Sequence, residues 1–203
     1  MNRARERFLV MHALAVKKHG RADDIAAVAG LDLAIVSRLL ADLAATDRVQ
    51  EADGHYLLSP LARVALNGYY SRWYGELRDD PSFLAANDRF ERINSELKAL
   101  ITDWQMMTIG GQRVLNDHSD TDHDARIIDR LGALHERAQP VLADFERCEP
   151  RLGHNRRALG EALDRAEGGA IDWVSDARIP SYHTVWFELH EDLLRIAGRQ
   201  RVE

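Results

Sequence analysis

The stretch from residue 20 to residue 67 places the strongest limit on how this chain can fold. It holds two short segments with helical spacing, separated by Gly30, which can end a helix because it tolerates positive φ. Two strand-like runs follow at 48–51 and 55–58, on either side of a tight Ala52-Asp53-Gly54 connection. Because Asp-Gly between such runs is a strong hairpin signal, the stretch predicts a pair of helices followed by a two-stranded ribbon.

Further helices are predicted on each side of these elements. Helical spacing covers residues 3–19 up to Gly20, and Ser59-Pro60 supplies a cap and a first turn for a helix after the ribbon. The second helix of the pair, 33–45, can be capped by the carboxylate of Asp32. Its spacing turns these residues outward: Ala34, Ser37, Arg38, Ala41 and Asp42. The order of elements is that of a winged helix-turn-helix.

Several motifs in this stretch resemble the winged-helix DNA-binding domain of the MarR type. They are Ala26 to Gly30, Val36-Ser37-Arg38-Leu39-Leu40, Leu43 and Leu58-Ser59-Pro60-Leu61-Ala62, and they span about a quarter of the chain. The resemblance implies that the helix 33–45 enters the major groove of duplex DNA, where Arg pairs with guanine edges and Ser reaches bases or phosphates. By residue match, it implies that Ser37 and Arg38 contact DNA.

Four basic residues complete the predicted DNA contacts: Lys17, Lys18, Arg21 and Arg48. Two features depart from the family pattern. Leu33 and Ala34 stand where base-reading residues are usual, and the hairpin carries Glu51 and Asp53 without a Lys or Arg at its tip. Because affinity for DNA comes mostly from neutralising phosphates, these carboxylates favour an alternative, in which the winged helix serves protein contacts or dimerisation.

The charge of the chain is unevenly distributed. Residues 1–67 contain 9 Lys and Arg against 8 Asp and Glu, whereas the remaining residues contain 18 against 25. An acidic surface does not bind a polyanion, so any nucleic acid is expected to bind the first third of the chain.

Residues 61–78 are predicted to form one long helix, which Asp79-Asp80-Pro81 ends. It carries a cluster of large side chains: Tyr69, Tyr70, Trp73, Tyr74 and Leu77. We expect this cluster to seal the junction between two domains, with a ligand-stacking wall as the alternative. The predicted domains are a winged helix-turn-helix with its linking helix, 1–79, and an all-helical ligand-binding or dimerisation domain, 80–203. The fold class is therefore mainly α, with a small β-hairpin.

Helical spacing predicts the organisation of the second domain. A helix runs from Ser82 to Met107, and a polar loop follows from Thr108 to Asp120. A second helix begins near Asp122 and is bent at Pro140, and the last one lies between Pro180 and Gly198. A shorter helix lies between them, around these residues: Leu159, Leu163 and Ala166. In the last helix the predicted buried stripe is Tyr182, Val185, Trp186, Leu189, Leu193 and Ile196.

The segment 116–124 contains two His and four Asp, which suits either of two roles. The acids can cap the helix that begins near Asp122, because negative charge is favoured at a helix N-terminus. Alternatively, a divalent transition metal binds there through His and carboxylate ligands. The predicted ligand or metal contacts are His118, His123, His135, His183 and His190. This set of residues distantly resembles the metal ligands in helical effector domains of the FadR branch of GntR regulators. Those domains hold a metal with an Asp and three His. We predict no other cofactor.

Signatures of catalysis and of membrane insertion are absent from the sequence. It has no phosphate-cradling glycine motif, no HExxH and no G-x-S-x-G, so no catalytic residue is predicted and the chain is not expected to be an enzyme. The lone Cys148 is interpreted as a packing residue. No run of about 18 apolar residues and no signal-peptide pattern occurs, so we expect a cytoplasmic protein without membrane contact.

These observations predict a DNA-binding transcriptional regulator. Its expected partners are double-stranded DNA, a second copy of the chain in a homodimer and a small-molecule effector bound by the helical domain. Two alternatives remain open from the sequence. One is an adaptor that uses the winged helix for protein contacts, and the other is a metal-dependent enzyme built on the His and Asp cluster.

Overall fold

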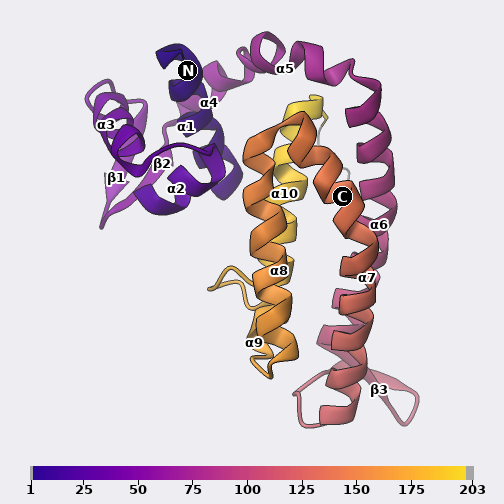
Figure 1. Ribbon diagram of the computed structural model, residues 1–203. Coiled ribbons are helices and arrows are strands. Elements are labelled where there is room, and N and C mark those ends of the chain that lie inside the picture. The colour runs from indigo at the N-terminus through magenta and orange to yellow at the C-terminus, as the bar shows by residue number, and fades with distance from the viewer. Residues whose placement is uncertain (1, 200–203) are drawn as a thin grey trace.

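The computed structural model describes residues 2–199 and is mainly helical, with two small antiparallel two-stranded sheets (Figure 1). The N-terminal elements are α1 (Arg3–Lys17), α2 (Ala22–Ala29), α3 (Leu33–Ala44), β1 (Val49–Ala52), β2 (His55–Leu58) and α4 (Pro60–Asn67). They are followed by α5 (Tyr70–Arg78), α6 (Pro81–Gln105), β3 (Met106–Ile109), β4 (Gln112–Leu115), α7 (Thr121–Cys148), η1 (Pro150–Leu152), α8 (Gly153–Glu167), α9 (Asp172–Ser175) and α10 (Tyr182–Ala197).

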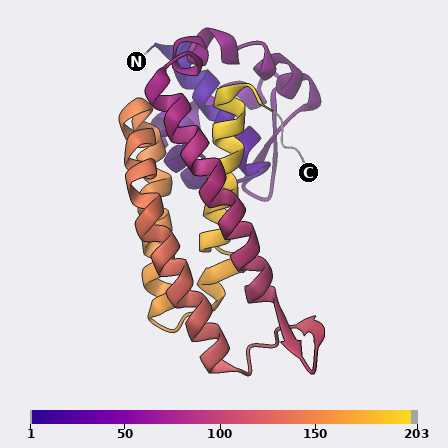
Figure 2. The ribbon, with the colours of Figure 1, turned by 90° about the vertical axis from the view of Figure 1, so that its right-hand side faces the viewer.

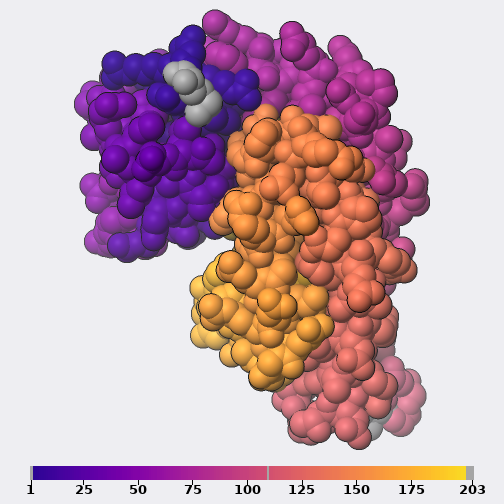
Figure 3. All heavy atoms as spheres, in the orientation of Figure 1, coloured from indigo at the N-terminus to yellow at the C-terminus, as the bar shows by residue number. Residues whose placement is uncertain are grey.

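The N-terminal elements form a lobe beside one end of an elongated bundle made by α6, α7, α8 and α10 (Figures 1 and 2). Within the bundle α7 lies between α6 and α8, and α10 contacts α8. The lobe is not separate from the bundle: α10 contacts α1 and α5, and α2 contacts α8, so the two parts pack side by side in the space-filling view (Figure 3). Among the described helices, none is long and apolar enough to cross a membrane.

The predicted hairpin is confirmed at 49–58. β1 and β2 pair antiparallel with Ala52 opposite His55, and the turn residues Asp53 and Gly54 have φ values of 52° and 74°. Positive φ at both central positions is the geometry that Asp-Gly favours, and it matches the twist of the strands. The predicted cap after the hairpin is also confirmed, because the Ser59 hydroxyl accepts a hydrogen bond from the amide of Ala62 at 3.2 Å.

Two local predictions in the first third of the chain are wrong. Asp32 occupies the N-cap position of α3, but its side chain makes no capping hydrogen bond. The helix predicted over 61–78 is two helices, α4 and α5, and at the break the amide of Tyr69 bonds the carbonyl of Leu66 at 2.9 Å, three residues back. Gly68, a weak helix former, lies at this break, and the new direction of α5 carries Tyr70 inward against α1.

The polar loop predicted over 108–120 is wrong in its first half. Residues 106–115 form the β3–β4 hairpin, in which Met106 pairs with Leu115, and α6 therefore ends at Gln105 rather than Met107. The two-residue turn is Gly110-Gly111, with φ values of 58° and 83°. A Gly-Gly turn between two short strand-like runs is a hairpin signal in its own right. This hairpin lies at the tip of the bundle farthest from the N-terminal lobe (Figure 2).

Aromatic side chains from three helices fill the centre of the bundle. The rings of Phe90 on α6 and Trp186 on α10 stack with their centroids 4.7 Å apart, and Phe145 on α7 meets Phe90 edge-on at 5.8 Å. All three residues are almost completely buried. The buried stripe predicted for α10 is confirmed in full: Tyr182, Val185, Trp186, Leu189, Leu193 and Ile196. Burial of this stripe stabilises the packing of α10 in the bundle.

Candidate nucleic-acid interface

α3 presents one apolar face to the core and one open face to solvent. The buried residues are Val36, Leu39, Leu40 and Leu43. The exposed ones are Leu33, Ala34, Ser37, Arg38 and Ala41. Most of the exposed side chains are short, so the backbone of α3 can approach another surface closely, with Arg38 as its only long polar side chain. Such a helix has the dimensions of the DNA major groove.

A carboxylate at the rim of this face is neutralised within the chain. Asp42 on α3 forms an ion pair with Arg3 on α1, with 2.8 Å between nitrogen and oxygen. The hairpin tip is different, because Glu51 and Asp53 are both exposed there. The Glu51 carboxylate accepts a hydrogen bond from the amide of Gly54 at 3.3 Å, which orders the turn but leaves the negative charge at the tip. These two carboxylates oppose contact between the hairpin tip and a phosphate backbone.

The four basic residues predicted to contact DNA lie in three different places. The Lys17 ammonium pairs with Glu188 on α10 at 2.9 Å, and the Lys18 ammonium lies 5.5 Å from the centre of the Phe187 ring on the same helix. Both lysines therefore face the bundle. Arg21 is exposed beside the hairpin turn, and Arg48 directly precedes β1 at the C-terminal side of α3.

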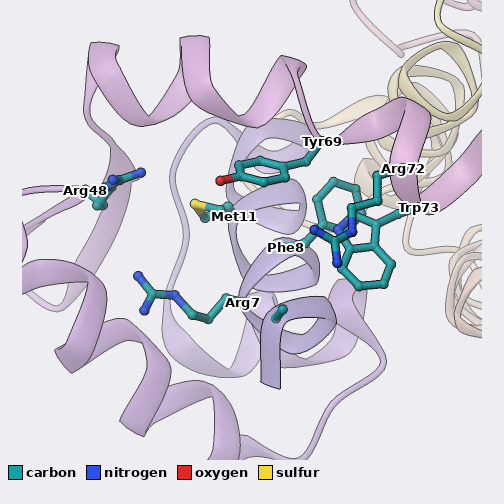
Figure 4. A pocket seen from close by; sticks show the side chains of 8 residues that line it. Arg7, Phe8, Met11, Arg48, Tyr69, Arg72 and Trp73 are labelled. Atoms are coloured by element: carbon teal, nitrogen blue, oxygen red, sulfur yellow. The ribbon is translucent and has the colours of Figure 1, made fainter. Parts of the chain in front are cut away.

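Arg48 belongs to an arginine-lined cavity that the sequence did not indicate (Figure 4). We call it the arginine pocket; its walls are Ala4, Arg7, Phe8, Met11, Arg48, Tyr69, Arg72 and Trp73. α1 supplies one wall, the α4–α5 junction supplies the opposite one, and Arg48 closes it from the α3–β1 connection. Within residues 2–199, the guanidinium groups of Arg7, Arg48 and Arg72 make no ion pair. Arg7 and Arg48 add positive charge next to α3, because α1 contacts α3 and Arg48 follows it in the chain.

The five histidines predicted to bind a ligand or metal do not converge. His123 contacts the carbonyl of Asp103, His135 contacts the Tyr182 hydroxyl, and His190 pairs with Glu91. His183 shares a small apolar cavity between α6 and α10 with His190. No group of three or more His, Cys, Asp or Glu within residues 2–199 is arranged to hold a metal ion.

The segment 116–124 acts as a cap for α7. The Asp120 carboxylate accepts a hydrogen bond from the amide of His123 at 2.9 Å, and Asp122 and Asp124 lie in the first helical turn, as the capping interpretation predicted. Asp124 is buried and bonded to His118 at 2.9 Å and to Asn116 at 2.8 Å. These contacts tie the loop to the helix that it precedes.

A buried polar network joins the N-terminal lobe to the bundle. The Asp192 carboxylate on α10 accepts hydrogen bonds from His12 Nε2 and Arg151 Nη2, each at 2.8 Å. His12 Nδ1 lies 2.9 Å from the Tyr70 hydroxyl, and Arg151 Nη2 donates to the Tyr74 hydroxyl at 2.9 Å. We call these five residues the buried joint. All five residues are buried.

Protonation in the buried joint follows from burial and from charge. Burial lowers the pKa of His12; the adjacent Asp192 carboxylate opposes this effect, and the positive charge of Arg151 adds to it. Burial alone would raise the pKa of Asp192, but the charge of Arg151 and the contact with His12 outweigh it and hold this pKa well below its usual value. Neutral His12 can then donate a hydrogen bond through Nε2 to Asp192 and accept one at Nδ1 from the Tyr70 hydroxyl.

The lowered pKa of His12 predicts that acid destabilises the fold. Below the ordinary His value of 6.5 the unfolded chain binds a proton that folded His12 does not, so the free energy of unfolding falls as the pH drops from about 7 to about 5. The contribution of one such group is at most about 1.4 kcal/mol per pH unit. Denaturant titrations at several pH values measure it, and H12Q should have a shallower slope than the parent. A free energy of unfolding that rises on acidification would contradict neutral His12.

No protein-family model matches this chain, and no curated protein or solved structure matches it either. The case for a function therefore depends on the geometry of the exposed α3 face and of the arginines around it.

Proposed function

We propose that this chain is a DNA-binding transcriptional regulator whose N-terminal lobe is a winged helix-turn-helix. The observation that carries the proposal is the exposed face of α3, which bears Ser37 and Arg38 and has the unpaired Arg48 at its C-terminal side. In this proposal α3 enters the major groove, where Arg38 reads a base edge and Ser37 contacts a base or phosphate. The order of α2, α3, β1, β2 and α4 supports it, as does the resemblance to the MarR type.

The structure changes which cations this proposal uses for phosphate contacts. Arg7 and Arg48 have no carboxylate partner among the described residues and lie next to α3, whereas Lys17 and Lys18 face α10. Phosphate binding releases counterions, so each such contact contributes to affinity and to its salt dependence. We therefore propose Ser37, Arg38, Arg21, Arg7 and Arg48 as the DNA contacts.

A homodimer is part of the proposal. A single α3 with one long polar side chain offers few base contacts, and two copies related by a twofold axis would place two such helices about one DNA turn apart. Linking two weak contacts in this way raises the affinity without any new interaction within each half. The small-molecule effector is proposed to act by favouring one arrangement of the two lobes.

Binding to random-sequence duplex DNA tests the proposal. The association constant should fall steeply with salt, and R7A or R48A should each reduce the slope of log affinity against log salt by about 1. K17A is the matched control on the same helix, because Lys17 is held by Glu188, and it should leave the slope unchanged. Absence of binding at low salt would contradict the proposal.

Arg38 is expected to act differently from the phosphate contacts. With a DNA sequence selected from a random pool, R38A should weaken binding by about tenfold or more and relax the sequence preference, because a base contact is worth about 1–3 kcal/mol. R126A on α7 removes an exposed arginine far from α3 and should not change binding. If R38A lost the same affinity for selected DNA as for random DNA, Arg38 would not be a base-reading residue.

A second candidate function is an adaptor that uses the same lobe for protein contacts. It is favoured by the acidic hairpin tip and by Leu61 and Val64 on α4, which are 73% and 72% exposed. Exposed apolar side chains one helical turn apart are typical of a protein-contact face. If this candidate is correct, L61S/V64S changes the oligomeric state or the binding of a protein partner. The parent chain then shows no DNA binding even at low salt.

A further inference from the structure

A second arginine-lined cavity lies where α4 and α5 meet the C-terminal end of α10 (Figure 1). We call it the α10 cavity. Its volume is about 650 Å³, and its lining includes four arginines: Arg63, Arg78, Arg195 and Arg199. Among the described residues that line it, Glu191 is the only acid. Positive charge in the lining therefore exceeds negative charge, which favours an anionic occupant.

Two of these arginines are engaged with α10 itself. Arg78 donates through Nε to the carbonyl of Ile196 at 2.6 Å and through Nη2 to that of Arg195 at 3.3 Å, so it covers carbonyls at the end of the helix. The Arg195 guanidinium pairs with Glu191 at 2.7 Å. Its Nε atom, however, is buried and has no hydrogen-bond partner within residues 2–199. Because buried donors almost always have a partner, an acceptor from a bound molecule would satisfy this group.

The other two arginines have no partner in the described part of the chain. Arg63 on α4 and Arg199, directly after Gly198, are exposed, and neither guanidinium forms an ion pair or hydrogen bond there. One comes from the lobe and the other from the end of the bundle, yet both line the same cavity. A guanidinium can bind a phosphate through two parallel hydrogen bonds. The pair therefore suits an anion with two linked phosphate groups.

The rest of the lining offers both polar and apolar surface. The side-chain amide of Asn67 on α4 forms no hydrogen bond with another described residue, so its donor and acceptor remain available. Leu194 and the ring of Tyr70 supply apolar surface. A volume of about 650 Å³ lies within the range of small-molecule sites and exceeds what a diphosphate group alone would fill. The ligand is therefore expected to carry an organic body with hydrogen-bonding edges and an apolar face.

We propose that the α10 cavity binds a nucleoside diphosphate. Arg63 and Arg199 hold the two phosphate groups, and Asn67 forms hydrogen bonds with an edge of the nucleoside. Leu194 and Tyr70 pack against its apolar face. The ligand thus bridges α4 in the lobe and the end of α10 in the bundle. It uses none of the residues proposed to contact DNA, so the site can be tested without DNA.

Calorimetric titration of the full chain, without divalent cations, tests the ligand class. The probes are ADP, pyrophosphate, inorganic phosphate and adenosine. Affinity should fall at least about tenfold from ADP to pyrophosphate and again from pyrophosphate to inorganic phosphate, because each step removes a group that the cavity contacts. Adenosine, which lacks the charge, should bind at least about tenfold more weakly than ADP.

Each comparison among the probes can contradict one part of the proposal. Equal affinity for ADP and adenosine would overturn the role of the arginines. Equal affinity for ADP and pyrophosphate would overturn the role of the nucleoside, and equal affinity for pyrophosphate and inorganic phosphate would overturn the need for two phosphate groups.

Variants locate the binding. R63A and R199A should each weaken ADP binding by about tenfold, since each removes a charge-assisted contact, and both residues are exposed, so the fold should be kept. Two arginines outside the α10 cavity are the matched controls. R72A on α5, in the arginine pocket, and R126A on α7 should bind ADP like the parent. Unchanged binding by R63A and R199A would overturn the site, as would equal losses in the two controls.

Discussion

D192A is expected to lower the free energy of unfolding by about 3–5 kcal/mol, because it leaves the buried Arg151 guanidinium without its carboxylate. Arg151 donates to Asp192 through Nη2 at 2.8 Å, and both side chains are almost inaccessible to solvent. The loss of a partner for His12 adds to the effect. Urea denaturation followed by circular dichroism measures the change.

An ion pair at the surface, between the partly buried Asp176 and the exposed Arg178, provides the comparison for D192A. Asp176 pairs with Arg178 at 2.7 Å, but Arg178 is 87% exposed, and an ion pair of this kind is worth about 0–1 kcal/mol. D176A should therefore have a small effect. A double variant, R151M/D192L, should recover much of the stability lost in D192A, because apolar residues can replace a buried ion pair without leaving a lone charge. Equal stability of D192A and D176A would contradict the buried joint.

F90A is expected to destabilise the fold by about 3–5 kcal/mol, since it leaves a cavity among close-packed rings. Phe90 is fully buried and contacts Trp186 and Phe145. Because α10 contacts α8 within the bundle and α1 in the N-terminal lobe, we also expect the lobe to unfold in the same transition as the bundle. Calorimetry of F90A should show one transition at a lower temperature.

L84A on the same helix is the control for F90A. Leu84 is 39% exposed, so its truncation removes less buried surface and should lower the stability much less. Two separate transitions in F90A, with only one of them shifted, would show that the lobe and the bundle unfold independently.

Elements whose signals are local could be predicted from the sequence. The first hairpin depends on Asp53-Gly54, and the buried stripe of α10 depends on spacing within one helix, so both were recognised. The break at Gly68 was missed because a single glycine does not show whether a helix continues. The β3–β4 hairpin was missed although Gly110-Gly111 carried a usable signal, because the glycines were interpreted as part of a polar loop.

The candidate site was predictable only where one helix determines it. The exposure of Ser37 and Arg38 follows from the periodicity of α3. Periodicity does not show which neighbour covers the rest of a helix surface, so Lys17 was predicted to face DNA although it pairs with Glu188 on α10. The arginine pocket was not predicted for the same reason. Arg7, Arg48 and Arg72 come from three separate segments, which only the fold brings together.

The buried joint also orders events during synthesis of the chain. His12 and Asp192 are 180 residues apart, so the lobe leaves the ribosome long before its partner on α10 has been made. Until then His12 and Tyr70 have only water or each other as hydrogen-bond partners, and the surface that α10 will cover stays open. Contacts of such long sequence separation form late and slowly. A nascent chain that stops before α10 should therefore hold a lobe that proteases cleave readily, and extension through Asp192 should protect it.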